Sequence, residues 1–171
     1  MTINLPARTT DTLSVFISGS IAIRHLSSAV TARIAAIVER DLPVLIGDAR
    51  GVDNAVQRLI AERGTTNVTV FCADGFPRNN VGDWPVRNIA GEGRHGTAAF
   101  HAVKDRAMAV EAGAGLVIWD GRSRGSLANI HRLCARGCFV AVWLEREGRF
   151  ENLNSDEARA AFVARYPSCA H

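Results

Sequence analysis

The chain has almost no lysine and no block of like charge. Lys104 is the only lysine among its 20 basic residues, so arginine carries nearly all of the positive charge. Arginine favours planar, bidentate contacts with phosphate or carboxylate, although a codon bias would give the same composition. The formal net charge is only +3. Charge patterning therefore gives no indication of nucleic-acid binding.

Cysteines are few and long apolar runs are missing. The cysteines are Cys72, Cys134, Cys138 and Cys169, with no CxxC pair and no histidine at zinc-ligand spacing. This pattern predicts buried thiols in a reducing compartment. No stretch approaches the ~18 apolar residues of a membrane span, and the N-terminus lacks a signal-peptide core. We therefore expect a cytoplasmic protein that holds neither a metal nor a cofactor.

Apolar, β-branched runs alternate with helical patterns along the chain. The expected strands lie at about 13–18, 44–46, 68–72, 116–119 and 139–144, and the expected helices at about 27–40, 52–62, 98–112, 126–135 and 155–166. This alternation predicts an α/β fold, a Rossmann-like doubly wound, mostly parallel sheet of about five strands with helices on both faces. The length of 171 residues fits a single domain, 1–171, with a loose lead-in at 1–11, a core at about 13–144 and a helical tail at about 150–168.

The segment at about 73–97 shows neither a helical nor a strand period. A structureless loop of this length inside a compact domain is usually functional or disordered. Its Arg78 and Asn79 suit a lid that contacts a ligand, and a mobile surface loop is the alternative.

Three of the expected strands end at a glycine-rich polar turn that opens a helix. The turns are Ser18–Ser20, Gly47–Asn54 and Asp120–Ser126. In a parallel sheet the carboxyl ends of the strands lie at one edge, where helix N-termini present unpaired N–H groups and a partial positive charge. We therefore expect the three turns to converge on one anionic ligand.

The candidate site residues lie in these turns, in the 73–97 segment and in the helix before the fourth strand. The expected ligand-binding residues are Gly19, Ser20, Gly47, Asp48, Arg50, Gly51, Asp53, Arg78, Asn79, Lys104, Arg106, Asp120, Gly121, Ser123, Arg124, Gly125 and Ser126. Asp53, Asp120 and Arg106 are the candidate catalytic residues. The glycines could instead serve only the turns, and the two aspartates could cap helices.

Two short motif matches fit less well. Gly91–Gly96 matches a dinucleotide-binding string but follows a poor strand. Gly121–Gly125 matches a nucleophile elbow, but only His131 and His171 follow it, and neither is placed for a catalytic triad.

Together, the three turns and Lys104–Met108 resemble the SLOG superfamily, which joins the DNA-processing DprA/Smf proteins with the LOG phosphoribohydrolases. The closest similarity is to its YspA-related branch of small single-domain proteins. That branch shares the motifs seen here at Gly47–Asp53 and Trp119–Ser126. The resemblance covers about residues 13–144.

The resemblance implies a fold that binds a nucleotide or nucleotide-derived ligand, such as a nucleoside phosphate or an ADP-ribose-like molecule. It implies that Gly125 and Ser126 contact a phosphate and that Arg106 matches an arginine of the family. The glutamate of LOG enzymes is replaced by Asn129, whose amide carries no charge to stabilise an oxocarbenium-like transition state. We therefore expect a ligand sensor. A LOG-like N-glycosidase acting on nucleoside 5′-monophosphates, with Asp53 or Asp120 supplying the carboxylate, is the alternative.

A third hypothesis is single-stranded DNA binding, by analogy with DprA. It requires a strong salt dependence, which the scattered arginines do not indicate. We therefore expect a small-molecule partner and no nucleic acid. The apolar helix face of Ile34, Ile37 and Val38 leaves packing across a homodimer open.

Overall fold

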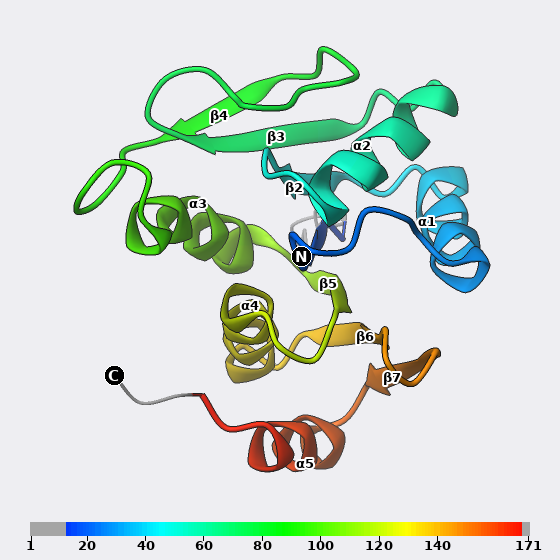
Figure 1. Cartoon of the computed structure of the whole chain (residues 1–171). Helices are drawn as coiled ribbons and strands as arrows, with labels where there is room; N and C mark the ends of the chain where they lie inside the picture. Colours follow the sequence, from blue (N-terminus) through cyan, green and yellow to red (C-terminus); the bar gives the residue numbers. More distant parts are fainter. Residues whose placement is uncertain (1–12, 169–171) are drawn as a thin grey trace, which may run out of the picture.

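A computed structural model describes residues 13–168, so the expected lead-in at 1–11 and Cys169 lie outside it. The strands are β1 (Val15–Gly19), β2 (Val44–Gly47), β3 (Val68–Ala73), β4 (Val86–Ile89), β5 (Ala114–Trp119), β6 (Phe139–Leu144) and β7 (Arg149–Leu153). They form one seven-stranded sheet in the order β4-β3-β2-β1-β5-β6-β7 (Figure 1). All pairs are parallel except β6 with β7. The predicted Rossmann-like, mostly parallel sheet is confirmed, with two strands beyond the expected five.

The helices are α1 (Ser28–Glu39), α2 (Val52–Glu62), α3 (Ala98–Glu111), α4 (Arg124–Ala135) and α5 (Asp156–Arg165). A serine or threonine hydroxyl caps all of them except α2 by accepting a first-turn N–H. The N-cap of α2 is Gly51, which offers no side chain. Within residues 13–168, none of the helices combines the length and hydrophobicity that a membrane crossing requires.

Helices cover both faces of the sheet (Figure 1). Residues of α1 and α2 pack with Val15 and Ile17 of β1 on one face. Residues of α3, α4 and α5 pack with Phe16 of β1 on the other. Because the inner strands are covered on both sides, they read as continuous apolar runs rather than alternating ones, and β5 is buried at every residue.

The strand order reverses between β1 and β5. From β1 the chain passes through α1 to β2 on one side, and from β5 through α4 to β6 on the other. In open α/β sheets, ligands bind at the carboxyl ends of the strands beside such a switch point. The fold therefore indicates a ligand site at the turns that follow β1 and β5.

The two edge strands were not predicted, because their sequences lack a buried apolar pattern. Residues of β4 are mostly exposed, and β7 carries polar residues around Phe150. An edge strand needs only one neighbour and little burial, so hydrophobic periodicity is a weak signal for it.

The expectation of a structureless lid at 73–97 is wrong for its middle part. Trp84 is only 6% exposed, belongs to the core on the α1/α2 face, and donates its indole N–H to the Thr65 carbonyl at 2.7 Å. The backbone N–H of Val81 donates to Gln57 Oε1 at 2.9 Å. The connection from β3 to β4 contains no helix. The Trp84 side chain nevertheless fixes it to the domain.

Trp84→Ala should lower the free energy of unfolding by ~3–5 kcal/mol, because it leaves a cavity in the core and an unpaired Thr65 carbonyl. Urea denaturation measures this. Phe76→Ala in the same connection, where the ring is 95% exposed, serves as the control and should change stability by under ~0.5 kcal/mol. Equal effects of the two variants would mean that the connection is not anchored.

Candidate functional site

The three predicted turns meet around Ser20, which is fully buried. Its backbone N–H donates to the Ile118 carbonyl at 3.0 Å, and its carbonyl accepts from the Val52 N–H at 3.4 Å. Its hydroxyl accepts from the Asp120 N–H at 3.1 Å and lies 3.5 Å from the Ser126 hydroxyl. The turns after β1, β2 and β5 therefore converge at one rim of the sheet, here called the carboxyl edge.

Two glycines allow the turns to approach one another this closely. A Cβ atom on Gly19 would meet the Ile118 carbonyl oxygen and lie 2.7 Å from a Val52 methyl group. Gly51 has φ +78°, and a Cβ there would strike the backbone of Ile21. At Gly125, by contrast, a Cβ would meet nothing within 4 Å. The N-terminus of α4 is therefore open to a ligand, whereas Gly19 and Gly51 serve packing.

Asp120 stabilises the turn before α4. One carboxylate oxygen accepts the N–H groups of Arg122 at 2.9 Å and of Ser123 at 2.8 Å. Although burial opposes it, these bonds from Ser123 and Arg122 hold the pKa of Asp120 below its ordinary value. Asp120 is thus an ionised structural group of the turn, like Ser123, whose hydroxyl caps α4 by accepting from the Ser126 N–H.

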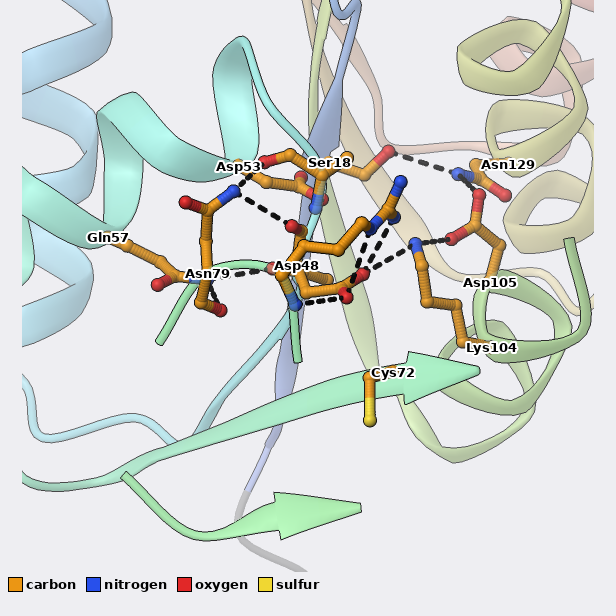
Figure 2. Close-up of polar contacts among 12 residues, drawn as sticks. Ser18, Asp48, Asp53, Gln57, Cys72, Asn79, Lys104, Asp105 and Asn129 are labelled. Atoms are coloured by element: carbon orange, nitrogen blue, oxygen red, sulfur yellow. Dashed lines mark hydrogen bonds and ion pairs between the residues drawn. The ribbon is translucent and has the colours of Figure 1, made fainter. Parts of the chain in front are cut away.

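Beneath the turn after β2 lies a buried cluster of charged side chains (Figure 2). Lys104 of α3 is 4% exposed, and its ammonium lies 3.0 Å from Asp105 and 4.0 Å from Asp48. A Cβ on Gly47 would lie 2.6 Å from Asp53 Oδ2 and 2.9 Å from Lys104 Nζ. Glycine at position 47 therefore makes room for the cluster. Burial alone would lower the pKa of Lys104, but the Asp105 and Asp53 carboxylates raise it.

Asp53 is 6% exposed, and the pKa of its carboxyl group is raised, whereas that of Asp48 is lowered. Burial raises the pKa of Asp53 to about 7, with the Asp105 charge adding to the effect and the Lys104 charge opposing it. Its Oδ2 atom accepts the Ala49 N–H at 3.1 Å, so it braces the turn after β2 from within. The Asp53 carboxyl group therefore changes protonation near neutral pH, although it is buried below the carboxyl edge.

Asp48 holds Arg78 and Asn79 against the turn. The Arg78 guanidinium donates to both Asp48 oxygens, at 2.8 and 3.2 Å, and the Arg78 backbone N–H adds a bond of 2.9 Å. Asn79 donates to the Asp48 carbonyl at 2.9 Å. Burial raises the pKa of Asp48, but the bonds and charge of Arg78 outweigh this and lower it overall.

Asn129 has a structural role that the sequence did not reveal. Its amide N–H₂ donates to Ser18 Oγ and to Asp105 Oδ2, both at 3.1 Å, which joins β1, α3 and α4. A glutamate at this position would place a second carboxylate against Asp105 and could not donate. Ser18 and Asp105 were likewise missed, because no spacing rule links residues 18, 105 and 129.

One candidate residue lies apart from the turns. Arg106 is exposed and pairs with Glu92 at 2.7 Å rather than with a turn residue. Arg50 and Arg124 are exposed, and Lys104 and Gly47 are buried beneath the edge. The structure thus brings the turn residues together but gives Arg106 a separate surface partner.

Exposed arginines follow the carboxyl end of every parallel strand within five residues. In chain order they are Arg24, Arg50, Arg78, Arg94, Arg122, Arg124 and Arg146. Among residues 13–168, only Arg78 of this set has a salt-bridge partner. The carboxylates nearby are engaged: Glu145 accepts from the Trp143 indole at 2.6 Å, and Glu147 pairs with Arg149 at 2.6 Å. Apart from Arg78, these guanidinium groups are therefore the unpaired charges of the carboxyl edge among the described residues.

Comparison with known proteins identifies the fold. No family model and no curated protein matches the chain. The chain is similar to DNA processing protein A from Helicobacter pylori, described for its unique single-stranded DNA binding mode, with 14% identity and a TM-score of 0.60 over 93% of this chain and 74% of that chain. It is also similar to DprA from Streptococcus pneumoniae, with 18% identity and a TM-score of 0.60 over 90% of this chain and 56% of that one. The chain thus spans little more than half of the pneumococcal structure.

These neighbours support the SLOG-type fold but do not confirm the YspA-related branch. They contradict the function predicted from the sequence. Both are DNA-processing proteins, and one is described by how it binds single-stranded DNA, so the predicted nucleotide-ligand sensor and its phosphoribohydrolase alternative are wrong. The expectation that nucleic acid is not a partner is wrong for the same reason. The sequence has no run of like charge, whereas the fold places single arginines from separate turns at one edge of the sheet.

Replacing the Asp53 carboxyl with an amide should remove a pH dependence of stability. Folded Asp53 keeps its proton up to about pH 7, whereas the unfolded chain releases it near 3.8, so folding stability falls as pH rises between these values. The slope is at most ~1.4 kcal/mol per pH unit. The free energy of unfolding of Asp53→Asn should rise relative to that of the wild type as the pH increases from about 3.8 to about 7. Above pH 7 the difference between the two proteins should stay constant.

Urea unfolding at a series of pH values measures this effect. The control is Glu157→Gln at the exposed start of α5, which should keep the wild-type slope. If Asp53→Asn also kept that slope, Asp53 would not be the group that retains the proton.

Proposed function

We propose that this chain binds single-stranded DNA across the carboxyl edge of its sheet. The row of exposed arginines that follows the parallel strands carries this proposal. Guanidinium groups bind phosphate oxygens through paired, charge-assisted hydrogen bonds. Because the arginines come from successive strands, they provide phosphate contacts along a line rather than at one point.

The N-terminus of α4 adds N–H donors to this line. It is open at Gly125, where a Cβ would meet nothing within 4 Å. First-turn N–H groups of a helix lack intrahelical partners and favour anions. This terminus lies at the switch point, where Ser20 joins the turns.

An exposed aromatic ring favours single-stranded over double-stranded DNA as the ligand. Phe76 follows β3 and is 95% exposed. Its position is set by the Gly75 carbonyl, which accepts from Asn88 at 2.9 Å, and by the Arg78 backbone bond to Asp48. Unpaired bases stack on such rings, whereas a duplex hides the faces of its bases.

The length of the edge fits a short stretch of strand. From β3 to β6 the sheet order passes through β2, β1 and β5. With ~4.8 Å between neighbouring strands, this path measures about 19 Å, enough for several phosphates. The DNA-binding DprA of Helicobacter pylori shares this fold, which supports the same ligand class for this chain.

Two further assignments concern the branch of the superfamily and the cellular compartment. The motifs at Gly47–Asp53 and Trp119–Ser126 support membership of the YspA-related branch. The thiols of Cys72, Cys134 and Cys138 are free, which supports a reducing, cytoplasmic location.

Replacing Arg122 and Arg124 together with glutamine should weaken binding to a fluorescently labelled single-stranded oligonucleotide. The loss of two phosphate contacts should reduce the slope of log K against log salt by about 1.4, since each contact on a single strand contributes ~0.7. Fluorescence anisotropy across a salt series measures both quantities.

The matched control is Arg40→Gln with Arg63→Gln, at the C-caps of α1 and α2 near the opposite edge. This variant carries the same change in net charge. Equal losses in the two double variants would point to bulk charge and contradict the carboxyl edge as the binding surface.

Phe76→Ala should weaken binding to single strands about 5- to 150-fold, the range expected for one lost base stack. Phe76→Trp should retain the affinity, because it keeps an aromatic face. Neither change should alter the salt slope, since no phosphate contact is removed. A loss in both variants, or a changed slope, would refute the stacking role.

A further inference from the structure

A small cavity of about 160 Å³ lies beside the turn that opens α4. It is lined by Trp119 at the end of β5 and Gly121 in the turn after it, by Leu144 at the end of β6 and Glu145–Glu147 after it, and by Tyr166 after α5. The cavity shares Gly121 with the Asp120–Ser126 turn, where the proposed function places a phosphate. Nothing in the sequence motifs or in the charged cluster accounts for it.

The cavity has fixed aromatic and apolar walls. The Trp119 indole N–H donates to the Ser123 carbonyl at 3.0 Å, and its ring meets the Tyr166 ring edge-on at 4.9 Å and 84°. Leu144 is 4% exposed. Bonding and packing thus hold the Trp119 and Tyr166 rings in place, and such a site suits a flat ring.

The polar side of the cavity carries one guanidinium and two carboxylates. Arg146 lies over Gly121, with its Cδ 3.5 Å and its Nε 3.7 Å from the position of a Gly121 Cβ. Arg146 has no salt-bridge partner among the described residues, while Glu145 and Glu147 are engaged with Trp143 and Arg149. The unpaired cation of the cavity is therefore the Arg146 guanidinium, which can donate to O6 and N7 of guanine together.

The volume of the cavity limits the size of the ligand that it can hold. A cavity of about 160 Å³ is well below the ~300 Å³ at which pockets for drug-sized ligands begin, so a whole nucleotide is too large. A single nucleobase can enter while its sugar and phosphate stay outside, at the α4 N-terminus and Arg122.

We propose that this cavity is a nucleobase pocket that selects guanine, whose O6 and N7 atoms accept together from one guanidinium, over adenine. The inference rests on the proposed DNA binding and adds a base preference to it. Arg146 donates to the base edge, and the Tyr166 and Leu144 walls enclose its faces. The pocket therefore reads one base of a strand whose phosphates the neighbouring turn holds.

The test uses an oligodeoxyadenylate and versions of it in which one central residue is dT, dG or abasic. The wild type should bind the dG version at least about fivefold more tightly than the parent, the dT version or the abasic version. Arg146→Gln should abolish this preference. Arg24→Gln, the control at the β1 end of the edge, should weaken binding to all four oligonucleotides equally and keep the preference.

The outcomes separate the two proposals. If the wild type bound none of the oligonucleotides, the proposed function would fail and the pocket with it. Equal, tight binding of all four would overturn the pocket and leave DNA binding standing. A preference that survived in Arg146→Gln would also overturn the pocket, because the selecting group would lie elsewhere.

Discussion

The parallel alignment of the strands on either side of the switch point is the constraint on which the site depends. Because β1 and β5 run side by side in the same direction, the turns after them emerge together, and Ser20 bonds to both Ile118 and Asp120. Gly19 and Gly51 make this approach sterically feasible. Everything attributed to the carboxyl edge, from the open α4 N-terminus to the row of arginines, follows from that shared direction.

The edge separates two sets of charges by depth. Below it, the Lys104 ammonium offsets the negative charge of the surrounding aspartates, and Asn129 donates to Asp105 in place of a further acid. Above it, guanidinium groups from successive turns face solvent with few acidic partners. The buried set braces the turns, whereas the exposed set is available to an extended polyanion. An inward-facing Asp53 and a turn-bound Asp120 give little support to the catalytic roles first assigned to them.

The fold class, the inner strands and the convergence of the turns could be predicted from the sequence, since buried parallel strands are continuous apolar runs and glycine turns mark their ends. The edge strands β4 and β7 could not, because exposed polar residues such as Arg87 and Glu151 leave no periodic signal. The anchoring of Trp84 and the Ser18–Asn129–Asp105 contacts depend on residues distant in sequence. The row of exposed arginines is hidden in the sequence for a related reason: Arg24 and Arg146 follow strands that only the folded sheet brings to one edge.

The most direct test of this account maps the binding surface residue by residue. Backbone amide chemical shifts recorded during titration with a short single-stranded oligonucleotide should change most at the turns, namely at Ser20, at Arg50 and Gly51, and at Arg124 and Gly125. Amides at the opposite edge, near Arg40 and Arg63, should stay unchanged. Shifts concentrated at that opposite edge, or none at the turns under saturating oligonucleotide, would contradict the central claim that strand-end arginines and the N-terminus of α4 form one DNA-binding surface.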